Sequence, residues 1–156
     1  MKKSVILIIA VIYVLAIVIV GFIGIRMRVY NENVYIESIT CVSDGFEKYE
    51  EGSDGAKNGL AGHITKTYET GLKVLIKCEY YPVNANAFEG KPFKYISGSS
   101  NNYNVIENND GTCTIEFKAV GSCDLIVMSK DSHKAEIRIR ITALPDDMCS
   151  KYGIGC

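Results

Sequence analysis

The hydrophobic pattern divides the chain into one solid apolar run and a long stretch of short alternating runs. Residues 5–25 contain no charge and no proline, and the phenol of Tyr13 is their only side-chain hydrogen-bonding group. A helix of this length covers about 30 Å, the thickness of the hydrocarbon core of a bilayer. We therefore predict that residues 5–25 form a transmembrane helix, with the lipid bilayer as its partner.

A cleaved signal peptide would also begin with a basic start and an apolar run. Its apolar run usually spans about 7–15 residues and ends at a small-residue cleavage site. The run here is longer, and no A-x-A pattern closes it. The sequence therefore favours an uncleaved signal anchor over a signal peptide.

Basic residues flank the anchor on both sides, so the positive-inside rule gives a nearly tied count. They are Lys2, Lys3, Arg26 and Arg28. The free amino terminus adds charge on its side, and six cysteines are more typical of an oxidising compartment. We expect a single-pass cell-membrane protein with residues 1–4 cytoplasmic, residues 26–33 as a juxtamembrane link and the following domain extracytoplasmic.

After residue 33 the pattern changes to short runs with alternating apolar and polar positions, which is typical of strands. The most regular run, residues 135–142, places Ala135, Ile137, Ile139 and Ile141 on one face. Residues 43–63 hold two Asp-Gly steps and predict a long loop. The expected strands are 34–42, 64–68 (an edge strand), 72–81, 93–96, 104–107, 112–118, 122–128 and 135–142. About seven short strands without helical periodicity predict an all-β sandwich over 34–143, followed by a cysteine-containing tail at 144–156.

Charge argues against nucleic acid as a partner. Four of the 17 basic residues flank the anchor, so the domain keeps 13 against all 18 acidic residues. Proteins that bind nucleic acid usually present a basic face to the phosphates. The mildly acidic domain therefore points to another kind of partner.

From residue 72 onward, turn residues recur in an order found in a known family. A strand ends at Pro82 and an Asn-Ala step, a serine- and asparagine-rich turn follows, and Asp110-Gly111, Gly121 and two alternating strands close the pattern. This order resembles the bacterial immunoglobulin-like domain family, group 2. That family usually has a tryptophan after the proline step; this chain has none, and Phe93 or Tyr95 would take its place. The resemblance implies an Ig-like β-sandwich serving as an adhesive or spacer module at a bacterial cell surface.

The cysteines allow several interpretations. No C-x-x-C pair is present, which disfavours a zinc ribbon or a thioredoxin-like site. Cys78, Cys113 and Cys123 fall on the inward positions of their strands, where they could be core thiols. The Ig-like resemblance instead implies a Cys78–Cys123 bridge across the sandwich, with Cys78–Cys113 as the rival.

The two last cysteines, Cys149 and Cys156, are separated by six residues in the tail and are expected to pair if the compartment oxidises. Cys41 has no predicted partner. A bridge typically adds about 2–4 kcal/mol to the stability of a small domain.

Few residues point to catalysis. His63 and His133 lie in turns, and consecutive Asp131, Ser132 and His133 cannot adopt the geometry of a catalytic triad. No Asp-x-Asp-x-Asp spacing supports a calcium site. We predict no enzyme activity, no metal and no cofactor. Four tyrosines could form an aromatic face for a protein or carbohydrate ligand, or could be half-buried strand residues; they are Tyr80, Tyr81, Tyr95 and Tyr103.

The sequence thus predicts a membrane-anchored, extracytoplasmic Ig-like domain with a non-catalytic binding, adhesive or spacer role. One alternative is a pilin-like filament subunit, although no glycine-based processing site precedes the apolar run. Another is a small subunit of a larger membrane complex, in which Gly21 and Gly24 would permit close helix packing. An extracytoplasmic enzyme has only scattered Asp and His residues behind it.

Overall fold

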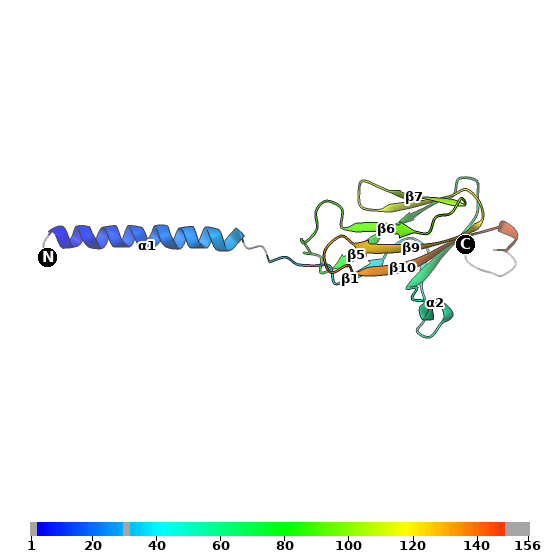
Figure 1. Ribbon diagram of the computed structural model, residues 1–156, viewed down its shortest axis with the longest axis horizontal. Coiled ribbons are helices and arrows are strands. Elements are labelled where there is room, and N and C mark those ends of the chain that lie inside the picture. Colours follow the sequence, from blue (N-terminus) through cyan, green and yellow to red (C-terminus); the bar gives the residue numbers. More distant parts are fainter. Residues whose placement is uncertain (1–2, 30–31, 149–156) are drawn as a thin grey trace. The chain divides into compact units, whose positions relative to one another are not determined.

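The computed structural model describes residues 3–29 and 32–148, and within the first helix it describes the side chains of residues 5 and 8–21. The chain forms two compact units that divide between Asn33 and Val34 (Figure 1). One unit is a single helix and the other is built mainly of strands.

The first unit is helix α1, Lys3–Val29. Uninterrupted aliphatic residues without proline leave the helical backbone intact, and the helix extends through residues 26–29, which we had expected in the link. Its described apolar side chains are exposed on every side of the helix, as the five consecutive residues 11–15 show. Over the described residues, we find no helix with the length and apolarity that crossing a membrane requires.

The second unit is mostly strand, which confirms the expected all-β class. The described residues form ten strands, more than the expected seven or so, and the short helix α2 (Asp54–Lys57). The strands are β1 (Ser38–Cys41), β2 (Phe46–Lys48), β3 (Gly62–Thr67), β4 (Lys73–Ile76), β5 (Cys78–Tyr81), β6 (Phe93–Ser97), β7 (Tyr103–Glu107), β8 (Cys113–Phe117), β9 (Gly121–Ser129) and β10 (Glu136–Leu144).

The strands pair into three sheets. One has the order β2-β3-β10-β9-β6, the second β4-β8-β7, and the third consists of β1 and β5. All pairs are antiparallel except β3 with β10. The prediction that residues 64–68 form an edge strand was wrong, because β3 lies between β2 and β10. The expected loop 43–63 contains β2. Gly62 lets β2 lie close to β3, because a Cβ at residue 62 would collide with the Glu47 carbonyl and the Phe46 ring.

The inward faces of the sheets share one hydrophobic core. The alternation predicted for 122–128 is confirmed, since Cys123, Leu125 and Val127 are fully buried while Asp124 is exposed. In β10 the buried positions are Ile139, Ile141 and Ala143, whereas Ile137 is only half-buried. Burial of these aliphatic side chains, at roughly 25 cal/mol per Å² of apolar surface, is the main stabilising term of the domain.

The expected single strand 72–81 is divided at Lys77. Strand β4 pairs with β8, whereas β5 pairs with β1 in another sheet. At the division, Lys77 N–H donates to Ser43 Oγ (2.9 Å) and Lys77 C=O accepts from Val42 N–H (2.9 Å) and from the Ser43 hydroxyl (3.3 Å). The alternation of side chains nevertheless continues across the division, because residues 74 and 76 are buried and 78 and 80 are half-buried.

Asp131 fixes the segment that leads into β1. Its carboxylate accepts hydrogen bonds from Ile36 N–H (2.6 Å), the Ser129 hydroxyl (2.7 Å) and Lys134 N–H (3.3 Å), and the residue is only 5% exposed. Burial alone would raise the pKa of Asp131, but these hydrogen bonds outweigh it and hold the pKa below its usual range. Asp131 is therefore a structural carboxylate, consistent with its rejection as a triad member.

The Asp131→Asn variant tests this assignment. A carboxyl whose pKa is lower in the folded state stabilises the fold above its unfolded pKa of about 3.9, and the contribution is lost as pH falls through the lower folded value. We expect urea unfolding at pH 7 to show a loss of about 2 kcal/mol, because the amide keeps a single, uncharged acceptor oxygen and cannot accept the hydrogen bonds that reach both carboxylate oxygens. At pH 3 the difference in the free energy of unfolding between the natural protein and D131N should be smaller than at pH 7.

The matched control is Asp44→Asn, since that carboxylate is solvent-exposed and has only a surface ion pair with Lys66. It should change the free energy of unfolding by less than about 0.5 kcal/mol. Equal losses in D131N and D44N, or a D131N loss that does not depend on pH, would contradict the assignment.

Candidate functional site: a cysteine pair at the sheet junction

Strands β1 and β5 bring two cysteines directly opposite each other. Cys41 pairs with Cys78 in the antiparallel register. The neighbouring pair, Val42 with Lys77, is joined by a backbone hydrogen bond, so Cys41 and Cys78 occupy a non-hydrogen-bonded position. Opposite Cα atoms at such positions are about 4.5 Å apart, which is within the range of about 4.4–6.8 Å that disulfides require.

The two thiols differ in environment. Cys41 is 5% exposed and donates a hydrogen bond to Ser43 Oγ (3.2 Å), whereas Cys78 is half-buried. A hydrogen bond with Cys78, assisted by Ser43 and opposed by burial, lowers the pKa of the Cys41 thiol to about 6. The same hydrogen bond, burial and the nearby charge of Cys41 raise the pKa of Cys78. The two thiols therefore differ in acidity, with the pKa of Cys41 lowered and that of Cys78 raised.

Sequence reasoning identified both cysteines but did not pair them. It expected a Cys78–Cys123 bridge across the sandwich, and the structure shows Cys41, Cys78, Cys113 and Cys123 as free thiols. The expected bridge is not formed, because the register places Cys78 opposite Cys41 on β1, whereas Cys123 lies opposite Ile141 on β10.

The other cysteine predictions have different outcomes. Cys113 lies close enough to Cys78 to affect its pKa, but the rival Cys78–Cys113 bridge is not formed either. Cys123 is fully buried, and this burial raises the pKa of its thiol. The predicted pair of Cys149 and Cys156 lies outside the described residues.

The four tyrosines do not gather on one exposed face. Tyr95 and Tyr103 are buried, and their hydroxyls donate to the carbonyls of Gly111 (2.7 Å) and Gly98 (2.8 Å). Tyr80 is half-buried, with its ring edge-on to two phenylalanine rings. Tyr81 is 64% exposed. The tyrosines are mainly strand residues of the core, the plainer of the two expectations.

A row of polar and charged side chains crosses the outer face of the five-stranded sheet. Glu47, His63, Arg140 and Asp124 are successive register neighbours on β2, β3, β10 and β9. His63 Nε2 lies 3.3 Å from Glu47 Oε2, and Arg140 contacts both carboxylate oxygens of Asp124 at 2.6 and 2.7 Å. The hydrogen bond from Arg140 holds the pKa of Asp124 below its usual range. Tyr49 stacks on His63, with ring centroids 4.9 Å apart.

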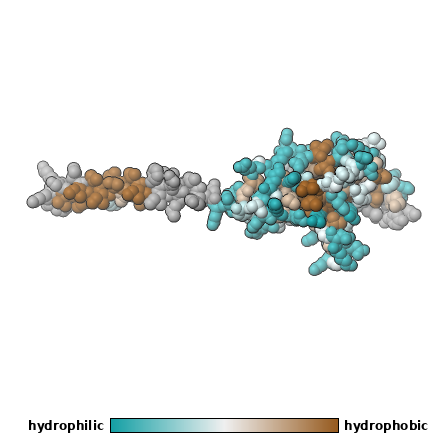
Figure 2. Space-filling model, viewed as in Figure 1, coloured by the Kyte–Doolittle hydropathy of each residue, from teal (hydrophilic) through white to brown (hydrophobic). Residues whose placement is uncertain are grey.

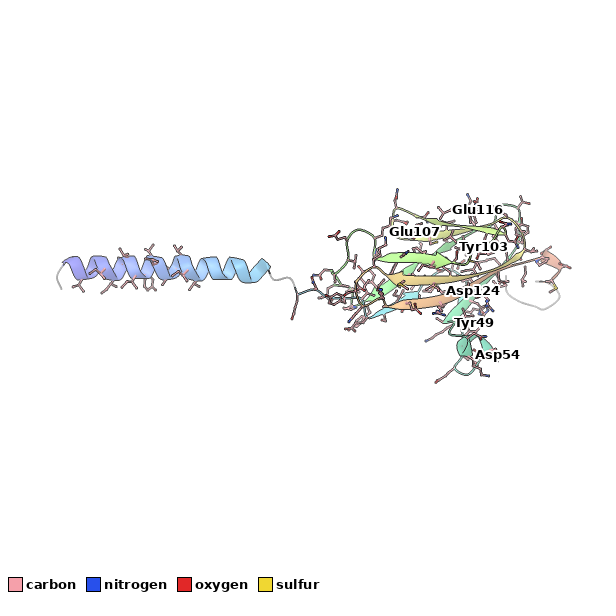
Figure 3. The ribbon with its side chains drawn as sticks, in the orientation of Figure 1. Tyr49, Asp54, Tyr103, Glu107, Glu116 and Asp124 are labelled. Carbon is pink, nitrogen blue, oxygen red and sulfur yellow. The ribbon has the colours of Figure 1, made fainter. Side chains whose placement is uncertain are left out.

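This face is polar, and the charges of Arg140 and Asp124 neutralise each other. Tyr49 and Asp124 are both labelled in Figure 3, and Figure 2 shows a mainly hydrophilic domain surface with small hydrophobic patches. Within residues 3–29 and 32–148, no three His, Cys, Asp or Glu side chains are grouped to hold a metal ion. The face offers ion-pair and stacking groups for recognition, and the cysteine pair is the more distinctive chemical feature.

No protein-family model matches the sequence, and no curated protein matches it as a relative.

The environment of Cys41 predicts a low thiolate titration. Far-ultraviolet absorbance of the folded protein should rise as one thiol ionises with a midpoint near pH 6. The Cys78→Ala variant removes the stabilising hydrogen bond, so the midpoint should move upward toward the usual cysteine pKa of about 8.5. Cys123→Ala is the control, because Cys123 lies away from the pair, and it should leave the midpoint near pH 6 in place. An unchanged titration in C78A would contradict the pairing.

Proposed function

We propose that this protein is a membrane-anchored, extracytoplasmic Ig-like domain with a non-catalytic binding or spacer role at the cell surface. In this proposal residues 5–25 insert into the lipid bilayer and the β-domain meets a protein or carbohydrate ligand, or holds another component away from the membrane. The observation that carries it is the join of an entirely apolar segment to a domain that buries its own core.

The apolar character of α1 supports the anchor. A helix that is apolar on all sides needs an apolar environment, either inside a large protein or in a bilayer. The described side chains of α1 are exposed, and the run of 21 apolar residues at 5–25 has the length of a bilayer span. In the pilin-like and small-subunit alternatives, other helices would pack against this helix. Packing against other helices requires only one apolar stripe, whereas a helix that is apolar on all sides is suited to contact with lipid all round.

Strand order supports an Ig-like domain. In an immunoglobulin sandwich, strands A, B, E and D form one sheet and strands C, F and G the other. Six strands of this domain follow that order if β10 is G: β4-β8-β7 corresponds to B-E-D and β6-β9-β10 to C-F-G, and β3 takes the place of A in the chain order. The departure is β3, which pairs with β10 instead of β4. Asp110-Gly111, one of the turns behind the resemblance to bacterial group 2 domains, joins β7 to β8.

The roles of the reactive residue types support a non-catalytic role. Asp131 is used to hold backbone N–H groups, His63 stacks on Tyr49, and the His133 ring contacts the Tyr35 ring at 5.0 Å. Each of these contacts is explained by packing or by backbone hydrogen bonding. The exposed polar face of the five-stranded sheet is the surface that we propose for ligand contact.

Membrane insertion is tested by charge. An arginine near the centre of a membrane-spanning helix costs about 2.5–3.5 kcal/mol on insertion scales. The triple variant Val11→Arg, Leu15→Arg and Val18→Arg should therefore lose most of its membrane association, measured as protein retained in membranes after an alkaline wash. The control V11L/L15I/V18L keeps the segment apolar and should be retained like the natural protein. Equal retention of the arginine variant would contradict the anchor, as would release of the natural protein by the wash.

Orientation is tested with a cysteine at an exposed site. Val83 is 84% exposed, so Val83→Cys in a C149S/C156S background places a reactive thiol on the domain surface. A membrane-impermeant maleimide should label this variant in intact cells, while the background protein without V83C reports labelling of the native core thiols. Labelling of V83C only after permeabilisation would place the domain in the cytoplasm and overturn the proposed location.

A further inference from the structure

We propose that Cys41 and Cys78 form a reversible disulfide that fastens β1 to β5, with an external disulfide of the glutathione or dithiol-oxidant class as the electron acceptor. The register of the two strands carries this inference, together with the position of both sulfurs at one junction. It concerns the domain alone and holds whichever side of a membrane the domain occupies.

The geometry needs little change for the bridge to form. The two residues are direct partners at a non-hydrogen-bonded position, so their side chains project to the same side of the two-stranded sheet. The two thiols also lie close enough for each to shift the pKa of the other. Cys113 and Cys123 have no such partner: Cys113 is paired with Ile76 and Glu107 in its sheet, and Cys123 with Ile141.

The exposure of the two thiols assigns their order of reaction. Cys78 is half-buried and meets the external disulfide RSSR first, after its thiol loses its proton to solvent. Attack of the Cys78 thiolate forms a mixed disulfide and releases one RS⁻, which takes up a proton from solvent. Cys41 in turn loses its proton to solvent. The Cys41 thiolate then attacks the Cys78 sulfur, the S–S bond to R breaks, and the second RS⁻ takes its proton from solvent. Two thiols are oxidised to one disulfide, and RSSR is reduced to two RSH.

The bridge would stabilise the two-stranded sheet of β1 and β5. A two-stranded sheet is marginally stable by itself, and β1 is the first strand after α1 in the chain. The bridge would close the loop 42–77, which contains β2, α2, β3 and β4. Because a disulfide restricts the unfolded chain more strongly when its loop is long, oxidation should stabilise the domain and keep β1 in place.

Peptide mapping of the full chain in mild detergent tests the proposal. Trypsin sites place the six cysteines in six different peptides, with Cys41 in 29–48 and Cys78 in 78–94. The protein is incubated with oxidised glutathione, remaining thiols are alkylated, and the digest is analysed without reduction. We expect a linked 29–48/78–94 species that disappears with dithiothreitol. Linkage of Cys78 to the Cys113 peptide, or alkylation of both Cys41 and Cys78 after oxidation, would overturn the proposal.

Two variants separate the roles of the two thiols. In Cys41→Ser the second step is blocked, so a glutathione adduct should accumulate on peptide 78–94. Cys123→Ser removes a core thiol outside the pair and should leave the 29–48/78–94 linkage intact. Oxidation should raise the melting temperature of the natural protein and of C123S but not that of C41S. The peptide map of the natural protein shows whether Cys41 and Cys78 are linked even if a variant fails to fold. A glutathione adduct on Cys41 in place of Cys78 would refute the assigned order of reaction.

Discussion

The β-domain depends on the hydrogen bonds made by the backbone N–H and C=O of one residue, at the point where the chain passes from one sheet to another. Lys77 lies between β4, which belongs to the three-stranded sheet, and β5, which pairs with β1. A backbone group that leaves a ladder without a new partner costs about 1–3 kcal/mol when buried. Ser43 accepts from Lys77 N–H and donates to Lys77 C=O, while Val42 N–H supplies a further donor. These contacts let a single run of alternating residues serve two sheets.

The same junction determines where the cysteines meet. Ser43 lies two residues after Cys41, and Lys77 directly precedes Cys78, so the hydrogen bonds that join Ser43 to Lys77 also set the register of Cys41 against Cys78. Asp131 holds Ile36, just before β1, from the far end of the sequence. The strand that follows α1 is thus tied at both ends, by a buried carboxylate and by the junction.

Alternation of apolar and polar residues predicted the strands whose two faces differ sharply. The inward residues of 122–128 and the run near 135–142 were located because each strand has one buried and one solvent-facing side. The position of β3 and the division at Lys77 depend on partners distant in sequence, and local patterning does not encode which strand lies alongside. The pairing of Cys41 with Cys78 was missed for the same reason. Tyr95 and Tyr103 occupy inward positions, and their hydroxyls find carbonyl acceptors, so tyrosine content alone overstated the binding face.

Amide hydrogen exchange on the full chain in lipid or detergent tests the junction most directly. The account predicts that the Lys77 amide exchanges slowly, with rates for β1 (Ser38–Cys41) and β5 (Cys78–Tyr81) close to those of the core strand β9, because all three open in one cooperative unit. Exchange of Lys77 and β1 at the rate of an unstructured chain, while β9 stays protected, would contradict it. That result would mean that the Ser43 contacts do not hold the two sheets together and that Cys41 is not kept opposite Cys78.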